Sequence, residues 1–453
     1  MTQAALCQRL LTDALAQVNT PLAALGGQTG LITCAEFIGQ AQRLAERLPS
    51  SPWVINLCEN RYLFMLAFCA AVLRGQTNLL PQNRAPATLE QLATNYPCAY
   101  ILHQGLDSLP ADIAACNINQ QSLLGDAATA IPDIPLDRLA AIAFTSGSTG
   151  QPKPNLKSWH TFVESSRINA QHMLPGRQTT HYELATVPPQ HMWGLETSVL
   201  LPLFAPICVS DAKPLFPQDV QQALSRLPEP RLLVSTPVHL RALTQSGIHW
   251  PTTTRVLCAT APLAPSLAQD VEQQFGGDLV EVFGCSEVGS MACRQTATED
   301  DWQLFTGLNF VNTEGDAYQV QADHLPDTVP LQDLIAFTPT GRFRLLGRNQ
   351  DMLEIAGKRG SLQELNHILL TTPGVLDGVV FMPDEEGQGT RRPVALAVID
   401  KTQTDKATLL ARFAERLDPV FIPRPLVLVD ALPREENGKL PRGKLLGFWK
   451  ELR

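Results

Sequence analysis

The sequence predicts an α/β protein with a large, helix-covered and mostly parallel sheet unit, a β-rich subdomain and a second, smaller α/β unit. Three observations predict this fold. Strand-like and helical patterns alternate from about residue 35, the helical pattern disappears between about 300 and 347, and a new α/β pattern begins after Arg348. Repeated βα units form mostly parallel sheets covered by helices. We therefore expect a domain boundary near 348–350, which divides the chain into residues 1–348 and 349–453.

Short apolar runs predict the strands of the first unit, and apolar positions with helical spacing predict its helices. The predicted strands are 53–57, 77–80, 139–144, 183–187, 231–235, 255–258 and 279–283, and the predicted helices include 61–74, 158–172 and 219–227. Segments 317–321 and 342–346 have the pattern of antiparallel strands. The second unit is predicted to contain helices 361–371 and 406–417 and strands 375–382, 393–399 and 426–429.

The composition indicates a globular protein that acts on small molecules. Its hydrophobic content of 44% and charged content of 17% are typical of soluble globular chains. A formal net charge of −9 argues against an extensive nucleic-acid-binding surface. The ten cysteines form no zinc-ligand pattern and are expected to be small buried residues in a reducing compartment. The longest apolar run, 62–73, is too short to span a bilayer, so we expect a cytoplasmic location.

The stretch 144–153, FTSGSTGQPK, directly follows the predicted strand 139–144. Glycines let backbone N–H groups approach an anion there, and hydroxyl and ammonium groups add further donors. On composition alone, a phosphate-binding loop and a flexible Ser/Gly turn are equally good interpretations. It is not a Walker A loop, because Pro152 stands where that pattern has its second glycine. The candidate phosphate ligands are Thr145, Ser146, Gly147, Ser148, Thr149, Gly150 and Lys153.

A second stretch, EVFGCSEVGS at 281–290, carries polar side chains at the end of a predicted strand. Ser286 offers a hydroxyl to a phosphate, and Glu287 offers a carboxylate to Mg²⁺. Taken in isolation, a strand end followed by the start of a helix is the favoured interpretation.

Two further stretches have the pattern of hairpins. Asp333 and Arg348 can lie at opposite ends of a hairpin that returns to one edge, where a carboxylate fits a ribose diol. In PREENGKLPR, at 433–442, an Asn-Gly turn presents Lys439. Alone, this last stretch is an ordinary surface hairpin.

In this order and spacing, the four stretches resemble the motifs of the adenylate-forming superfamily, which includes acyl-CoA synthetases, adenylation domains of peptide synthetases and firefly luciferase. FTSGSTGQPK is similar to its phosphate loop and FGCSE to its aromatic-Gly-x-Thr-Glu motif. The segment from Asp333 through GRNQDMLEIAGKRG is similar to its ribose-binding and hinge region, and NGK at 437–439 to its C-terminal lysine motif. The resemblance extends from about residue 30 to the last residue, and it implies a large N-terminal domain with a small, mobile C-terminal domain.

The resemblance also implies an activity. ATP would activate a carboxylic acid as acyl-AMP with release of pyrophosphate, and a thiol would then displace AMP. Catalysis would be largely electrostatic. Residues 145–153 would hold the β- and γ-phosphates, Ser286 the α-phosphate and Glu287 the Mg²⁺, while Lys439 would bridge the carboxylate and the α-phosphate. The remaining implied residues are Phe283, Ala261 and Pro262 at adenine, Asp333 and Arg348 at ribose, and Gln350, Gly357 and Arg359 at the hinge and thiol channel.

Four residues depart from the family pattern. Pro154 replaces the Gly that usually follows Pro-Lys, Ser286 replaces Thr, Gln350 replaces Asp at the hinge position, and Glu354 stands where Lys is frequent. None removes an essential group, because Ser keeps the hydroxyl and a hinge needs backbone freedom more than a given charge. The segment near 312–325 is also shorter than in most of the family.

The segment QHMWGLE at 190–196 resembles the family's aromatic/His segment. His191 and Trp193 would therefore wall the acid site, although a buried core His or Trp explains them equally well. Thr260, Gly289 and the stretch 235–239 would contribute further wall. The bulk of Trp193 favours a compact or aromatic acid over a long straight chain.

The thiol acceptor is either coenzyme A or the phosphopantetheine of an acyl carrier protein. Residues 434–453 contain six basic and three acidic residues, a local charge of +3 that suits an acidic carrier or the coenzyme A nucleotide and equally a solvated face. The alternative from another class is a non-catalytic nucleotide-binding or scaffold protein on the same fold. The joint presence of Lys153, Glu287, Asp333, Arg348 and Lys439 argues against it.

Overall fold

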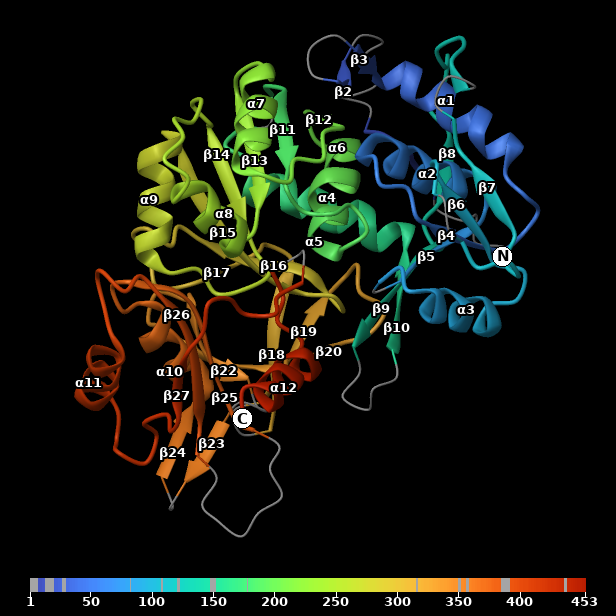
Figure 1. Cartoon of the computed structure of the whole chain (residues 1–453). Coiled ribbons are helices and arrows are strands. Elements are labelled where there is room, and N and C mark those ends of the chain that lie inside the picture. Colours follow the sequence, from blue (N-terminus) through green and yellow to red (C-terminus); the bar gives the residue numbers. More distant parts are fainter. Residues whose placement is uncertain are drawn as a thin grey trace.

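The chain folds into a large upper body and a smaller lower body in the orientation of Figure 1, with a β-rich region next to the lower body. The computed structural model describes residues 7–12, 20–26, 30–81, 83–106, 109–119, 123–146, 152–176, 178–314, 317–348, 352–355, 358–383, 392–435 and 438–453. A short sheet pairs β1 (Cys7–Arg9) with β8 (Asp133–Pro135).

The first large sheet has six strands, which are parallel except for the β10–β9 pair at one edge. In spatial order they are β10 (Pro152–Ser158), β9 (Leu139–Ser146), β5 (Thr77–Leu80), β4 (Trp53–Asn56), β6 (Tyr100–His103) and β7 (Ala115–Asn117). The sheet is accompanied by α1 (Cys34–Arg47), α2 (Arg61–Arg74) and α3 (Pro86–Asn95). Helix α2 is buried from Arg61 to Val72, because its apolar residues cover the whole circumference of the helix.

The second large sheet has nine strands and is parallel from β15 to β2, with antiparallel strands at both edges. In spatial order they are β17 (Gln303–Leu304), β16 (Gly289–Arg294), β15 (Asp278–Cys285), β14 (Arg255–Cys258), β13 (Arg231–Ser235), β11 (His181–Ala185), β12 (Ile207–Ser210), β2 (Pro21–Leu25) and β3 (Gly30–Thr33). The carboxyl ends of β11, β13, β14 and β15 therefore meet at one edge, the place where open α/β sheets bind ligands.

Seven helical segments belong to this part of the chain. They are α4 (Trp159–Met173), α5 (Met192–Leu195), a π-helix (Glu196–Leu200), α6 (Leu201–Phe204), α7 (Pro217–Arg226), α8 (Pro237–Thr244) and α9 (Pro265–Phe275). The π-helix lies in the connection from β11 to β12, and π-helical turns often occur at functional sites.

The β-rich region contains β18 (Leu308–Glu314), β19 (Ala317–Ala322) and β20 (Val329–Pro330) in one sheet and the hairpin of β21 (Asp333–Phe337) with β22 (Phe343–Arg348). Phe343 joins this region to the nine-stranded sheet, because its ring packs 6.3 Å from that of Phe283 and its backbone pairs with Trp302.

The small C-terminal domain has a three-stranded sheet of β25 (Val375–Phe381), β26 (Val394–Ile399) and β27 (Leu426–Leu428). Helices α10 (Leu362–Leu370) and α11 (Lys406–Arg416) contribute to one core, and α12 (Arg442–Glu451) to another. The hairpin of β23 (Met352–Ile355) and β24 (Lys358–Ser361) precedes them.

The predicted α/β fold class is confirmed, and several strand and helix bounds agree with the sequence analysis. Segments 61–74, 77–80, 231–235 and 255–258 have the predicted bounds. The strand predicted at 183–187 is shifted, since β11 begins at His181, which is buried at 3% exposure and pairs with Ile207. In the described part of the chain, no helix is both long and apolar enough to cross a membrane.

Candidate active site

The residues Ser286 and Glu287 lie at the tip of a hairpin at the carboxyl end of β15. Strands β15 and β16 pair antiparallel, with Cys285 opposite Gly289, so the intervening residues form the turn. Both Ser286 and Glu287 are half-buried. The interpretation as a helix start is therefore wrong, and the two side chains stand at the ligand-binding edge of the sheet.

A buried lysine holds this turn from one side. Lys157 of β10 is 2% exposed, and its Nζ donates a hydrogen bond to the backbone carbonyl of Glu287. Burial lowers the pKa of Lys157, while the carboxylates of Glu196 and Glu287 favour its charged form. On the same strand, Lys153 is exposed and pairs with Thr145 of β9. Strand β10 thus connects the segment predicted to bind phosphate with the turn predicted to bind Mg²⁺.

A buried carboxylate holds the turn from the other side. Glu196, the first residue of the π-helix, accepts hydrogen bonds from the backbone N–H of Ser290 at 3.1 Å and from its hydroxyl at 2.9 Å. Gly289 has a φ of +102°, and a Cβ there would lie 2.3 Å from Glu196 Oε1. Burial raises the pKa of Glu196, and the hydrogen bonds from Ser290 and the charge of Lys157 oppose this shift. Position 289 therefore requires glycine on grounds of both conformation and space.

The predicted wall of the acid site is built against the carboxyl ends of β11 and β13. Trp193 is buried, and its indole N–H donates to the backbone carbonyl of Ser235 at 3.0 Å. The hydroxyl of Thr186 lies 2.9 Å from that of Ser235 and 2.8 Å from Nδ1 of His239. The half-buried His191 precedes Trp193 at the N-cap of α5. The segment 191–193 and the stretch 235–239 are thus neighbours.

Thr260 follows β14 at the same edge and has a φ of +87°. A β-branched residue rarely adopts this conformation, and such strain is concentrated at functional sites. The backbone just beyond Ala261 and Pro262 is fixed, because the N–H of Leu263 donates to Glu281 Oε1 at 3.0 Å. Glu281 in turn accepts hydrogen bonds from Arg294.

Phe283, the predicted adenine neighbour, lies one strand over from Thr260 and is half-buried. Its ring packs against Trp302 at 5.7 Å and Phe343 at 6.3 Å between centroids. Phe343 belongs to β22, in whose hairpin Asp333 pairs directly with Arg348. The predicted return of these two residues to one edge agrees with the structure.

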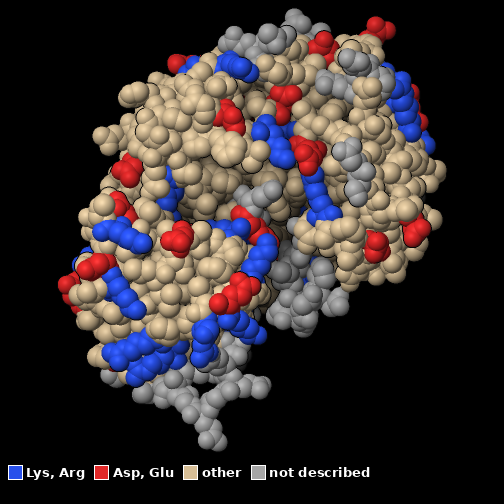
Figure 2. All heavy atoms as spheres, in the orientation of Figure 1, with Lys and Arg blue, Asp and Glu red and all other residues tan. Residues whose placement is uncertain are grey.

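The turn that precedes Lys439 packs against the first turn of α8. A Cβ on Gly438 would lie 3.3 Å from Val238 Cγ2 and 3.4 Å from Thr236 Oγ1, and Gly438 has a φ of +79°. Two backbone hydrogen bonds of 2.8 Å, from Gly438 N–H to Glu435 and from Glu435 N–H to Lys439, close the turn. Lys439 is exposed. Figure 2 shows a hollow between the upper and lower bodies of the molecule.

Gly147, Ser148, Thr149, Gly150, Gln350 and Gly357 lie outside the described residues, as do the side chains of Thr145, Ser146, Arg348 and Arg359. The described part of the site nevertheless brings together the ends of β11, β13, β14 and β15 with the turn at Gly438, although Gly438 lies far from these strands in the sequence.

Sequence analysis missed Lys157 and Glu196. The signal that could have found Glu196 is a carboxylate inside the otherwise largely apolar segment MWGLETSVLLPLF at 192–204. Lys157 gave no comparable signal. In an ordinary strand the apolar side chains are buried and the charged ones exposed, but here Leu156 is 58% exposed and Lys157 is buried.

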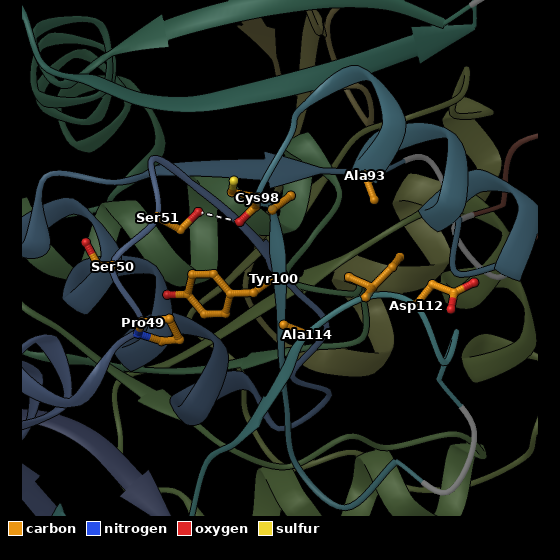
Figure 3. Close-up of a pocket in the computed structure, with 10 residues that line it drawn as sticks. Pro49, Ser50, Ser51, Ala93, Cys98, Tyr100, Asp112 and Ala114 are labelled. Carbon is orange, nitrogen blue, oxygen red and sulfur yellow. Dashed lines mark hydrogen bonds between the residues drawn. The ribbon is translucent and has the colours of Figure 1, made fainter.

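A separate pocket of about 400 Å³ lies next to the six-stranded sheet, near Ser51 and Cys98, and no predicted site residue lines it. Figure 3 shows its wall, where Ser51 donates a hydrogen bond to the carbonyl of Cys98 at 2.6 Å. Cys7 and Cys98 are both exposed, so the expectation that the cysteines are buried is wrong at these two positions.

Comparison with known proteins agrees with this geometry. The family of AMP-binding enzymes matches residues 16–316, and that of the AMP-binding enzyme C-terminal domain matches residues 364–439. A 4-coumarate–CoA ligase of Rhodobacter capsulatus is 27% identical over 301 residues, which is 66% of this chain and 74% of that protein. A linear gramicidin synthase of Brevibacillus parabrevis is 25% identical over 484 aligned residues, covering 92% of this chain but only 9% of that protein.

The whole fold also matches solved structures. ATP-bound MatB from Rhodopseudomonas palustris superposes with a TM-score of 0.82 at 19% identity, covering 99% of this chain and 100% of that chain. The apo form of the same protein superposes with a TM-score of 0.73 over the same coverage.

The fold and the matched motifs define an adenylate-forming enzyme, and the chain belongs to the family of AMP-binding enzymes. Within it, the protein is an AMP-forming acid–thiol ligase, which makes an acyl-AMP and passes the acyl group to a thiol.

Proposed function

We propose that the acid is compact or aromatic and that the acyl group passes to the pantetheine thiol of coenzyme A or of an acidic acyl carrier protein. The observation that carries the proposal is the packing of the Gly438 turn against Thr236 and Val238, at the edge where β13, β14 and β15 end. A binding-only protein has no need for a lysine-bearing turn from the small domain at this edge.

In this proposal the site residues have the roles that the family resemblance implies, and the positions of the described ones support these roles. Glu287 and Ser286 face the nucleotide phosphates from the hairpin tip, with Lys153 on the neighbouring sheet. Lys439 carries the positive charge that draws the acid's carboxylate toward the α-phosphate and offsets the negative charge of the transition state. Phe283 contacts the adenine, and Asp333 with Arg348 the ribose.

The residues of the turn fit Mg²⁺. Among the described residues, no three His, Cys, Asp or Glu side chains gather into a metal-binding group. A single half-buried carboxylate, Glu287, suits Mg²⁺, since this ion is usually held by one or two carboxylates together with substrate phosphates. When bound, Mg²⁺ would neutralise phosphate charge.

The predicted wall of the site supports the acid class. Trp193 is buried in a hydrophobic core cluster and fixed by its hydrogen bond to Ser235, and in this proposal its bulk limits the length of the acyl group. Next to Gly289, the hydroxyl of Ser290 donates a hydrogen bond to Glu196, whose carboxylate occupies the space beside the glycine. A relative acts, by its name, on 4-coumarate, which is an aromatic acid.

The positive charge of the small domain supports the proposed acceptors. Figure 2 shows Lys and Arg side chains gathered on the lower body, and residues 434–453 carry a local charge of +3 within a chain of −9. An acidic carrier or the coenzyme A nucleotide is attracted to such a surface.

We also propose a cytoplasmic location, because thiols stay reduced there. Cys58 and Cys69 are such thiols, and burial raises the pKa of both.

The test is acid-dependent exchange of pyrophosphate into ATP, measured with benzoate, 4-coumarate, succinate and palmitate. We expect the fastest exchange with an aromatic acid. Fastest exchange with palmitate would contradict the compact or aromatic class, and no exchange with a broad acid library would favour the non-catalytic alternative. Radiolabelled acid with ATP and either coenzyme A or a holo-carrier protein then distinguishes the two acceptors.

A further inference from the structure

Three charged residues connect the small domain to the nine-stranded sheet beside Lys439, and the activity does not assign them a role. Arg241 lies on α8, Asp377 on β25, and Arg434 just before the Lys439 turn. All three side chains are about four-fifths buried, with exposures of 19%, 20% and 17%.

Asp377 is the centre of this group. Its carboxylate accepts two hydrogen bonds of 2.8 Å from Nε and Nη2 of Arg434 and a third of 2.8 Å from the backbone N–H of Gly378. A bidentate pair of this kind is strong and fixes geometry. The other terminal nitrogen of Arg434, Nη1, donates to the carbonyl of Gly438 at 3.1 Å. Asp377 therefore fixes, through Arg434, the turn that presents Lys439.

Arg241 reaches the same carboxylate from the other domain. Its Nη1 lies 3.6 Å from Asp377 Oδ1, a longer and single contact compared with the two short bonds of Arg434. It belongs to the helix whose first residues pack against Gly438. The contact inside the small domain is thus tight, whereas the contact between the domains is weak enough to break without disturbing the turn.

We propose that Arg241, Asp377 and Arg434 form an interdomain latch that sets Lys439 at the sheet edge for acyl-AMP formation and opens for thiol transfer. This inference depends on the proposed role of Lys439 and on rotation of the small domain between the two half-reactions. All three are positioning residues, since each acts through Lys439.

The test separates the half-reactions in the full-length enzyme. In Arg241→Ala, the rate of pyrophosphate release with the best acid of the panel should fall about three- to tenfold, because a contact worth about 0.6–1.4 kcal/mol is lost. Thiol transfer from preformed acyl-AMP should be unchanged or faster. Arg241→Lys, which keeps the charge, should recover part of the rate. Arg226→Ala, at an exposed arginine on α7, is the matched control and should leave both rates unchanged.

An equal fall in both half-reactions would make Arg241 a structural residue and overturn the latch, as would no change in either. A second measurement does not depend on activity: backbone hydrogen exchange over 237–241 and 438–441 should be faster in Arg241→Ala than in the wild type. If the wild type adenylates no acid, the proposed function fails, and the exchange measurement still decides whether Arg241 holds the domains together; unchanged exchange would overturn that contact.

Discussion

The turn that carries Ser286 and Glu287 and the turn that carries Lys439 are held in opposite ways. The first is fixed by almost fully buried charged groups, Lys157 on one side and Glu196 on the other. The second is held against the sheet edge by partly exposed charged side chains. The contact between Arg241 and Asp377 is longer than that between Arg434 and Asp377. The difference supports the proposal that the side of the site with Ser286 and Glu287, the permanent side, stays fixed, while the side with Lys439, the releasable side, can separate from the sheet edge.

The largest effect on stability is expected when the buried Lys157 beside the Ser286–Glu287 turn is removed. Lys157→Met removes the hydrogen bond to Glu287 and leaves the buried Glu196 without its positive neighbour, so the free energy of unfolding should fall by about 3–5 kcal/mol. Chemical denaturation measures this. The double variant Lys157→Met with Glu196→Gln should recover much of the loss, because no uncompensated charge remains.

Lys153→Met is the matched control for this stability measurement, since Lys153 lies on the same strand but is exposed. Its unfolding free energy should stay within about 0.5 kcal/mol of the wild type. A loss of similar size in both variants would mean that the turn is not held by the buried charge of Lys157.

The releasable side should show its largest effect on rate rather than on stability. Lys439→Ala should lower acid-dependent pyrophosphate exchange by about 10²–10³-fold, as expected when one charge at the transition state is lost, and should leave ATP binding largely intact. Exchange kinetics and calorimetric ATP titration measure the two quantities. Lys450→Ala, at an exposed lysine on α12, should exchange at the wild-type rate. Wild-type exchange in Lys439→Ala would refute the role of this lysine.

A smaller effect is expected at the glycine that joins the turn to Glu196. Gly289→Ala places a Cβ against Glu196 Oε1 in a left-handed conformation, so it should destabilise the fold by about 1–3 kcal/mol and weaken Mg²⁺-dependent exchange. Gly447→Ala, in a helix with open space around the residue, should instead stabilise by about 0.5–1 kcal/mol. Thermal unfolding of both variants checks the opposite signs.

The contrast between locally defined elements and long-range contacts also explains how much of the fold and of the site could be predicted from the sequence. Strands β13 and β14 are predicted with their bounds because each has an apolar and buried centre, so the sequence pattern alone defines them. Strand β10 was not predicted, since its exposed Leu156 and buried Lys157 reverse the usual alternation. The motifs located the turns, but their supports, Glu196, Arg241 and Asp377, depend on contacts between segments that are distant in the sequence.

The last effect depends on pH and concerns a second buried pair on the permanent side. Glu183 of β11 is fully buried near Arg61, and burial raises its pKa from 4.5 to about 8 while the charge of Arg61 opposes the shift. Between these two values, the folded protein binds a proton that the unfolded chain has lost. The free energy of unfolding should therefore fall as pH rises through this window, by up to about 1.4 kcal/mol per pH unit from this group.

Glu183→Gln should remove this contribution, so its unfolding free energy should depend less steeply on pH between about 5 and 8 than that of the wild type. Denaturant unfolding at several pH values measures the slope, and Glu90→Gln, at an exposed glutamate of α3, should keep the wild-type slope. An unchanged dependence in Glu183→Gln would mean that the carboxylate stays charged beside Arg61 throughout this pH window. In that case the permanent side would be held by an ion pair here as well, and the contrast with the latch would rest on burial alone.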